Sequence, residues 1–302
     1  MHEPAPTEAR STVTKPLRIR LHVIARATFG PVALVMLLTS CARQTVVRGV
    51  DGASPTLRVM TYNIQSGHGN LDAAISAIRD ARPDIVGLQE VDVHWAERSG
   101  FVDQATTLGE RLGMSVRFAR IYSIPVQDAS RPPREFGVAL LSRFPIVAWR
   151  NDTLTRLSTQ DANPVPSPAP GLLDATVDVR GTRVRVFNTH LDYRADPRIR
   201  QRQVAEMLDY IGPPSVPTIL LGDLNAEPQA RELAPLLAVL HDSWLPASGP
   251  GLTYPADVPR KRIDYVLVSL HFRVHATVVP AIEASDHRPV IVDLSVAPTR
   301  AR

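Results

Sequence analysis

One stretch of the sequence has an especially informative pattern: Thr218-Ile219-Leu220-Leu221-Gly222-Asp223-Leu224-Asn225. An apolar run leads into a glycine, an acid and an amide, and Glu227-Pro228 then breaks regular structure. This order predicts a buried strand that ends at Asp223 and Asn225. Alternate strand residues point to the same side, so these two side chains are expected to address one reacting group. Because acids and amides also cap loops and helices, the stretch is decisive only together with similar ones.

Similar stretches occur along the chain, where strand-like runs end in polar residues. These residues are Asn63, Glu90, His190 with Asp192, Asp264, and Asp286 with His287. Groups at strand ends converge along one sheet edge in layered α/β folds. Carboxylates, amides and imidazoles without thiolates suit Mg²⁺, with Mn²⁺ and Ca²⁺ as alternatives. The set favours phosphoester hydrolysis, in which a metal polarises the phosphoryl oxygen, a carboxylate orients water and an imidazole offsets developing charge.

The apolar periodicity from residue 57 to 297 predicts one α/β domain, with no repeat and no internal boundary. Helices are expected from residue 71 to Pro83 and at 102–112, 196–211 and 230–240. Residues 163–171, rich in Pro, Ser and Ala, are expected to form an exposed loop. Strands are expected at 57–62, 84–90, 136–141, 146–149, 172–179, 184–189, 218–221, 263–269, 272–279 and 290–296.

Residues 1–40 have the order of an export signal. Arginines precede the apolar run 32–38, which is too short to span a bilayer, and Leu38-Thr39-Ser40-Cys41 resembles the bacterial lipobox. Cys41, the only cysteine, is therefore predicted to be lipidated, which implies export and a lipid anchor in the bacterial cell envelope. The alternatives are a signal peptide cut near an incidental cysteine, or a short buried helix. Residues 41–56 are expected to be a tether.

The charge distribution bears on the partner. The formal net charge is +4, but residues 1–40 contain five basic and two acidic residues, which leaves the rest of the chain close to neutral. No basic run with interleaved aromatic residues indicates a nucleic-acid surface. DNA is therefore not the favoured substrate, although it is not excluded.

Taken in order, these stretches resemble the endonuclease/exonuclease/phosphatase superfamily, also called the DNase I-like fold. The resemblance covers about residues 57–296 and implies a four-layered αββα sandwich: two mixed β-sheets face to face, with helices outside. The motifs that carry it are Thr61-Tyr62-Asn63-Ile64, Leu88-Gln89-Glu90, Asn188-Thr189-His190-Leu191, Gly222-Asp223-Leu224-Asn225, Arg262-Ile263-Asp264-Tyr265 and Ser285-Asp286-His287.

The resemblance also implies roles for individual residues. Glu90 would be the principal metal ligand, with Asn63 and Asp286 completing or supporting the site. In the catalytic set, Asp223 would position water, Asn225 would hold a phosphate oxygen, His287 would act at the scissile phosphate oriented by Asp264, and His190 would be a second imidazole. Because Asp286 and His287 are adjacent, a turn beginning at Ser285 is required for both to serve one site.

Several residues keep alternative interpretations. Arg98 and Arg200 are candidate substrate contacts, because guanidinium groups suit phosphate oxygens, but they equally fit a solvated helix face or pairing with nearby acids. Asp264 could pair with Arg260 or Arg262, and His190 could be a buried hydrogen-bonded histidine.

The sequence thus predicts a divalent-metal-dependent phosphoesterase. A lipid headgroup or another small phosphodiester is the favoured substrate, because a membrane tether and a near-neutral mature chain fit it. The segment from Gln89 to Gln104 also looks like that of proteins of GPI-anchor lipid remodelling. The alternatives are a secreted Mg²⁺-dependent nuclease and a non-catalytic binding lipoprotein.

Overall fold

The structure is a computed structural model that describes residues 56–128 and 130–296, and all structural statements refer to these residues. The predicted signal peptide, Cys41 and nearly all of the predicted tether lie outside them. The α-helices are α1 (Leu71–Ala81), α2 (Gln104–Leu112), α3 (Arg198–Ile211) and α4 (Ala234–Val239). The strands are β1 (Leu57–Asn63), β2 (Ile85–Val93), β3 (Ser115–Ile124), β4 (Arg134–Ser142), β5 (Ile146–Arg156), β6 (Ser167–Val179), β7 (Thr182–His190), β8 (Thr218–Asp223), β9 (His241–Asp242), β10 (Asp264–Val268), β11 (Phe272–Val278) and β12 (Val290–Val296).

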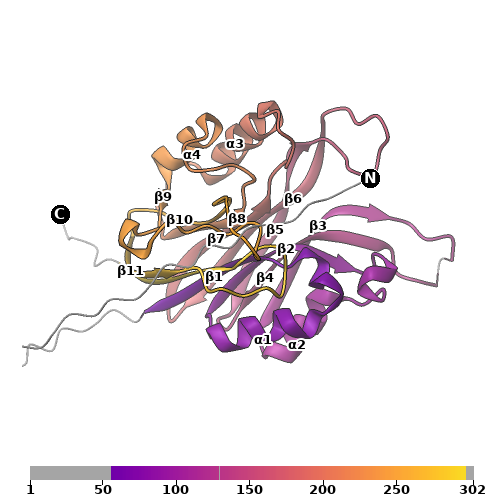
Figure 1. Cartoon of the computed structure of the whole chain (residues 1–302), viewed down its shortest axis with the longest axis horizontal. Coiled ribbons are helices and arrows are strands. Elements are labelled where there is room, and N and C mark those ends of the chain that lie inside the picture. The colour runs from indigo at the N-terminus through magenta and orange to yellow at the C-terminus, as the bar shows by residue number, and fades with distance from the viewer. Residues whose placement is uncertain (1–55, 129, 297–302) are drawn as a thin grey trace, which may run out of the picture. The chain divides into compact units, whose positions relative to one another are not determined.

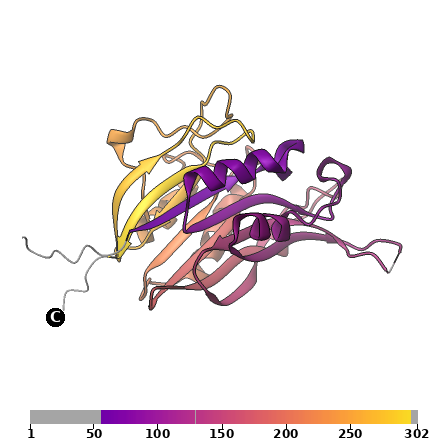
Figure 2. The ribbon, with the colours of Figure 1, turned by 90° about the horizontal axis from the view of Figure 1, so that it is seen from below.

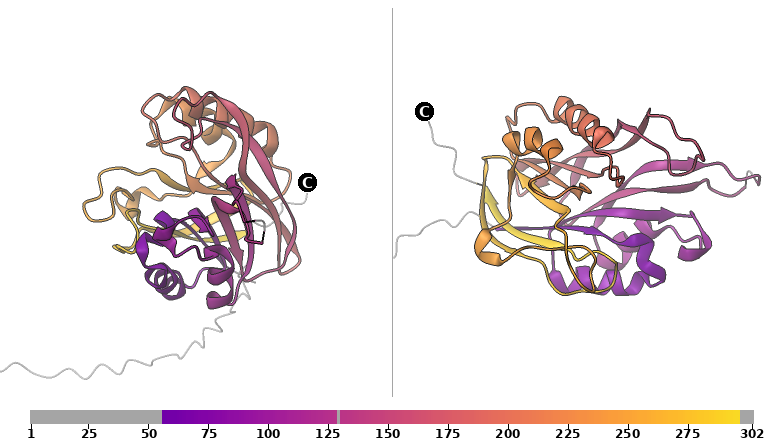
Figure 3. Two further views of the ribbon diagram at one scale, coloured as in Figure 1. Left: turned by 90° about the vertical axis from the view of Figure 1, so that its right-hand side faces the viewer. Right: turned by 45° about the horizontal axis from the view of Figure 1, so that its top comes forward.

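The strands form two six-stranded mixed sheets, in the orders β11-β12-β1-β2-β4-β3 and β5-β6-β7-β8-β10-β9. Helices α3 and α4 cover the outer face of the second sheet, and α1 and α2 cover the outer face of the first (Figure 1; Figure 2, seen from the side of α1 and α2). Figure 3 shows the same layers from two further directions. The predicted αββα sandwich is confirmed.

Three apolar clusters correspond to the three interfaces between the layers. The central cluster joins the inner faces of the sheets, for example Val59 and Leu140 of the first with Val186 and Leu221 of the second. A second cluster packs the first sheet against α1 and α2, and a third packs the other sheet against α3 and α4. The central strands are therefore buried on both faces, which is why the runs Ile85–Leu88 of β2 and Ile219–Leu221 of β8 are apolar without alternation.

A buried polar bridge links the two sheets inside the central layer. The Asn188 side chain donates to the carbonyl oxygens of Leu88 and Ala139, both at 2.9 Å, and its Oδ1 accepts from Nε2 of Gln89 at 2.7 Å. Gly87 leaves room for this bridge, since a Cβ there would lie 2.9 Å from Asn188 Oδ1 and 2.8 Å from Leu221 Cβ. Gln89 and Asn188 belong to the sequence motifs but hold the sheets together rather than entering the site.

We expect Asn188→Ala to lower the free energy of unfolding by roughly 2–4 kcal/mol, because it leaves buried carbonyl and amide groups without partners. Urea unfolding followed by circular dichroism measures the change. Asn163→Ala, in an exposed segment, is the matched control and should be nearly neutral. Equal stability of the two variants would show that the bridge does not stabilise the sandwich.

Several elements differ from their predictions; β5, for example, runs to Arg156 instead of ending at residue 149. β2 does not end at Glu90 but continues to Val93, and β3 was not predicted at all. β6 begins at Ser167, so only the first part of the expected loop 163–171 lacks strand structure. The stretch 230–240 is a short 3₁₀ turn (Arg231–Leu233) followed by the six-residue α4 rather than one helix. Its Pro235, at the start of α4, lacks the N–H that would continue the preceding turn.

Candidate active site

Two parallel strand pairs bring four of the predicted residues to one edge. β1 pairs in parallel with β2 after the α1 crossover, and β7 pairs in parallel with β8 after the α3 crossover. The carboxyl ends of each pair therefore meet at one edge. In the first sheet this places Asn63 and Glu90 together, and in the second it places His190 opposite Asp223 in register. Side-chain contacts between the sheets, given below, join the two halves.

The remaining residues reach this edge from antiparallel strands. Asp264 is the first residue of β10 and lies in register with Asp223 on β8. β12 runs antiparallel to β1, with Val290 opposite Thr61, so the segment before it returns to the end of β1. This segment bends over 284–287, as the adjacency of Asp286 and His287 required. The Ser285 hydroxyl fixes the bend by donating to the Asn63 carbonyl at 2.7 Å.

Asp223 lies at the centre of the site and is 1% exposed. Its Oδ2 accepts from Nδ2 of Asn63 at 3.1 Å and lies 3.4 Å from Nε2 of His190 and 3.6 Å from Nε2 of His287. Its Oδ1 accepts from the backbone N–H of Asn225 at 2.9 Å. Burial, reinforced by the nearby Asp264 carboxylate, raises the pKa of Asp223 above its usual value. The carboxylate is thus held rigidly by groups from both sheets.

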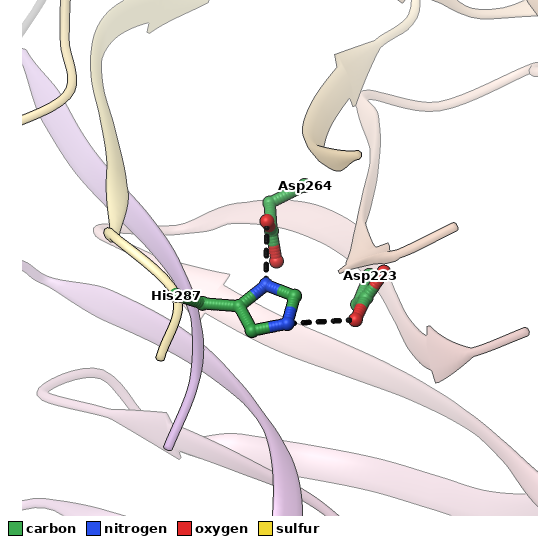
Figure 4. A group of neighbouring side chains, drawn as sticks. All are labelled: Asp223, Asp264 and His287. Atoms are coloured by element: carbon green, nitrogen blue, oxygen red, sulfur yellow. Dashed lines mark hydrogen bonds and ion pairs between the residues drawn. The ribbon is translucent and has the colours of Figure 1, made fainter. Parts of the chain in front are cut away.

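His287 lies between two acids (Figure 4). Its Nδ1 is 2.9 Å from Oδ2 of Asp264, while Nε2 faces Asp223. Burial alone would lower the pKa of His287, but the Asp264 and Asp223 carboxylates outweigh it and raise the pKa to about 10. The ring of Tyr254 packs on the imidazole with centroids 4.8 Å apart. The imidazole is therefore oriented, cationic at neutral pH and shielded on one side.

His190 and Asn225 lie next to each other at the site. Asn225 adopts a left-handed backbone conformation, with φ of 50°, which asparagine tolerates better than most residues. Its Nδ2 lies 3.0 Å from Nε2 of His190 and donates to the Leu191 carbonyl at 3.1 Å.

Asp264 does not pair with Arg262, whose guanidinium instead bonds Asp242. The structure therefore brings all five predicted catalytic residues together.

Glu90 and Asp286, the two carboxylates predicted to hold a cation, both line the cleft described below. Glu90 sits in a β-bulge of β2, where the pairing with β4 shifts between Leu88 and Val91, and its φ is 55°. Burial, together with the Glu90 carboxylate, raises the pKa of Asp286 above its usual value. Within the described residues neither acid forms an ion pair with Lys, Arg or His. Two neighbouring carboxylates without a cationic partner fit a divalent ion.

Asn63, the third predicted ligand, connects the carboxylates. Its Nδ2 donates to Oε1 of Glu90 at 3.0 Å as well as to Asp223, and its Oδ1 accepts from the backbone N–H of Gln65. In this arrangement Asn63 supports the carboxylates. A different group, Asp223, Asp264 and His287, has ligand atoms within 4.8 Å of one another and could also hold a metal ion. The hydrogen bond between His287 and Asp264 already occupies two of its members.

A cleft of about 550 Å³ is lined by seven of the predicted residues, Glu90, His190, Arg200, Asp223, Asn225, Asp286 and His287, and by further groups not predicted from the sequence. Arg194 and Lys261 add positive charge to its lining, and Tyr193 and Tyr254 add aromatic rings. Tyr193 and Arg194 follow His190 closely in the sequence, which is a usable signal. Tyr254 and Lys261 come from a segment with no recognisable motif. Its backbone N–H groups of Thr253 and Tyr254 donate to the Lys261 carbonyl, and the Lys261 N–H donates to the Tyr254 carbonyl.

The two predicted substrate arginines are engaged in structural contacts. Arg98 forms a bidentate pair with the buried Asp92, at 3.0 and 2.9 Å, and is not among the residues of the cleft. Arg200 lines the cleft, but its Nε and Nη2 donate to Glu232 and its Nη1 donates to the carbonyls of Asp192 and Arg194. Direct substrate contact by either side chain stays a prediction.

The fold and site define a class: αββα sandwich proteins that gather acids, amides and histidines at one edge of paired sheets. The sequence profile of the endonuclease/exonuclease/phosphatase family matches residues 60–287, and the chain belongs to this family. Its members are hydrolases that act on phosphoesters and are generally dependent on divalent metals. No curated protein sequence matches the chain significantly.

Solved structures show the same fold. An endonuclease/exonuclease/phosphatase from Beutenbergia cavernae is 28% identical, with a TM-score of 0.64 over 82% of this chain and 74% of that one. The human Nocturnin catalytic domain with a bound sulfate anion is 22% identical, with a TM-score of 0.61 over 81% of this chain and 96% of that one. A mannosyl-6-phosphatase of Bacteroides thetaiotaomicron is 19% identical, with a TM-score of 0.57 over 79% of this chain and 99% of that one.

Proposed function

We propose that the chain is a divalent-metal-dependent phosphoesterase that hydrolyses a phosphodiester, with a lipid headgroup or another small phosphoester as the favoured substrate. The observation that carries the proposal is the position of the Asp223 carboxylate, within hydrogen-bonding or ion-pairing reach of Asn63, His190 and His287 at the floor of an open cleft. A buried carboxylate between two imidazoles serves to orient and deprotonate water. It contributes little to stability, because burying it is costly.

Each residue of the site has a chemical task in this proposal. Glu90 and Asp286 would hold Mg²⁺, or Mn²⁺ or Ca²⁺ in its place, which when bound polarises a phosphoryl oxygen. Asp223 accepts hydrogen bonds that fix its direction and takes a proton from the attacking water. His287, kept cationic by Asp264 and Asp223, donates a hydrogen bond to the phosphoryl oxygen where negative charge grows. Asn225 and His190 hold a second phosphoryl oxygen.

The lining of the cleft supports a small substrate. Lys261 adds a positive charge to the acidic lining, which suits a phosphodiester that carries one negative charge. Arg194 also lines the cleft, but its guanidinium pairs with Asp192. A polynucleotide would need a longer row of cations along its backbone. The nuclease alternative is decided by experiment.

We expect the protein to hydrolyse bis-p-nitrophenyl phosphate with Mg²⁺ or Mn²⁺ and to lose this activity in EDTA. A panel with phospholipid vesicles and supercoiled plasmid assigns the natural class, because release of a headgroup supports the proposal and plasmid nicking supports the nuclease alternative. If the folded protein turns over none of these phosphoesters with metal present, the proposed enzyme is contradicted. The non-catalytic binding lipoprotein is then the better description.

The membrane location is part of the proposal and rests on the sequence of residues 1–41. No α-helix among the described residues is long and apolar enough to cross a bilayer. We expect the full chain, expressed in a Gram-negative bacterium, to incorporate radiolabelled palmitate and to sediment with membranes. Cys41→Ala should remove the label completely, whereas Ser40→Ala should retain it. Equal labelling of the Cys41→Ala variant would contradict the anchor.

A further inference from the structure

A second, smaller pocket opens beside the cleft, and we refer to it as the side pocket. It has a volume of about 200 Å³ and shares Glu90, His190, Tyr193 and Arg194 with the cleft lining. A water molecule takes up about 30 Å³ in the liquid, so the side pocket has room for a group the size of a six-membered ring. A phosphoester whose phosphoryl group lies in the cleft can therefore place one substituent in the side pocket.

Gln203 gives the side pocket an unused hydrogen-bond donor. This residue of α3 is 0% exposed and lines the pocket. Its Oε1 accepts from the backbone N–H of Asp192 at 3.0 Å, which fixes the orientation of the amide. Its Nε2 has no hydrogen-bond partner among the described residues. A buried donor without an acceptor is unfavourable, and a ligand oxygen would offset this cost.

Arg156 adds a buried positive charge to the same lining. It is 7% exposed, and its guanidinium donates to the carbonyl oxygens of Pro170, Gly171 and His190. It forms no ion pair with a carboxylate in the described part of the chain, and burial lowers its pKa to about 10. A guanidinium has five N–H groups, more than these three acceptors use. Gln203 and Arg156 thus offer donors to an electron-rich oxygen, beside the carboxylates of Glu90 and Asp192 in the same lining.

The other part of the lining is apolar and flat. Tyr122 and Phe136 stack with centroids 6.1 Å apart and planes 22° apart, and Ile121 and Leu157 lie beside them. Aromatic faces of this kind favour a ring over a flexible chain, because a ring presents flat area and loses little conformational entropy on binding.

We propose that the side pocket is a subsite for an uncharged ring bearing oxygen acceptors, carried by the same phosphoester that reacts in the cleft. The inference rests on the proposed function. The ring packs on Tyr122 and Phe136, and its exocyclic oxygens accept from Gln203 and Arg156. A polyhydroxylated sugar or cyclitol ring and a pyrimidine base share this chemistry, and the experiment distinguishes them.

The test compares three phosphates by isothermal titration calorimetry of the full chain with Mg²⁺: glucose 1-phosphate, uridine 5′-monophosphate and glycerol 1-phosphate, which lacks a ring. We expect one ring phosphate to bind at least about tenfold more tightly than glycerol 1-phosphate, the size of one or two net hydrogen bonds. Tighter binding of glucose 1-phosphate identifies a sugar-like ring. Tighter binding of uridine 5′-monophosphate identifies a base.

Two variants of different kinds remove the subsite. Gln203→Glu keeps the acceptor for the Asp192 N–H but replaces the free donor with an acceptor, and Leu157→Trp fills the pocket. Both should lose the ring preference and keep the Kd of glycerol 1-phosphate. Gln201→Glu makes the same change at an exposed position of the same helix and should keep the preference.

Three results would overturn the subsite. They are no ring preference in the wild type, a ring preference that survives in both variants, or variants that lose affinity for glycerol 1-phosphate as much as for the ring phosphates. The proposed function is read separately, from turnover of bis-p-nitrophenyl phosphate by the same preparation. Turnover without ring preference removes only the subsite. Ring preference without turnover would contradict the phosphoesterase function and would support only a ring-binding pocket.

Discussion

The Asp223→Asn variant is expected to hydrolyse bis-p-nitrophenyl phosphate at least about a hundredfold more slowly than the wild type, because the amide cannot take a proton from water. The substitution keeps the size of the side chain and an oxygen that accepts from Asn63 or from the Asn225 N–H. The loss should therefore fall on kcat, with a smaller change in KM.

The controls separate chemistry from folding. Asp209→Asn makes the same change at an exposed position of α3 and should retain wild-type kcat. Thermal unfolding of Asp223→Asn should remain cooperative, because the amide keeps the size of the side chain, and this shows that the variant is folded. A variant that remains folded and keeps more than a tenth of wild-type activity would contradict the role of Asp223.

The His287→Asn variant is expected to lose about a hundredfold or more in kcat, because it removes the cation that faces the phosphoryl group. In the wild type the raised pKa of His287, about 10, keeps the imidazole protonated through neutral pH. Wild-type activity should therefore persist from pH 7 to 9 and fall above that range. If the residual activity of the variant does not change with pH over the same range, the assignment is supported. If the wild-type activity is lost around pH 6.5, the assignment is contradicted.

The same pKa shift has a consequence for stability. Because the pKa of His287 rises from 6.5 to about 10 on folding, its protonation stabilises the folded state fully below pH 6.5. This stabilisation is lost as the pH rises towards 10. In urea unfolding with EDTA, the free-energy difference between wild type and His287→Asn should shrink from pH 6.5 to pH 10. A difference that grows with pH would show that the imidazole is buried in its neutral form.

The parts of the fold that sequence patterns predicted well are the buried central strands. The apolar runs of β2 and β8 are unambiguous because both faces of these strands are covered. β1 and β7 instead show an alternating pattern, in which Arg58, Arg183 and Arg185 interrupt the apolar residues. The edge strand β3 was missed although Val116, Phe118 and Ile121 mark apolar positions in it, because its exposed residues interrupt the apolar signal. The length of an edge strand depends on its partner, here β4, which a one-dimensional pattern does not show.

For the site, the sequence predicted which residues converge but not their contacts. The bulge at Glu90 depends on tertiary pairing, so a strand end was predicted where β2 continues. Arg98 was predicted as a candidate phosphate ligand, but the sequence does not show that its guanidinium pairs with the buried Asp92. Gln203 follows Arg198 and Arg200 on the helix after His190, a stretch that could set substrate choice, but its unused donor is visible only once the Asp192 N–H is placed.

The central claim is that side chains from both sheets gather around a divalent cation at one edge, with Glu90 and Asp286 as its protein ligands. The most direct test is anomalous diffraction from crystals of the protein soaked in Mn²⁺. We expect a strong peak bound by the carboxylates of Glu90 and Asp286, within the cleft that Asp223 and His287 line. A peak between Asp223, Asp264 and His287 instead, or no peak at this edge of the sheets, would contradict it.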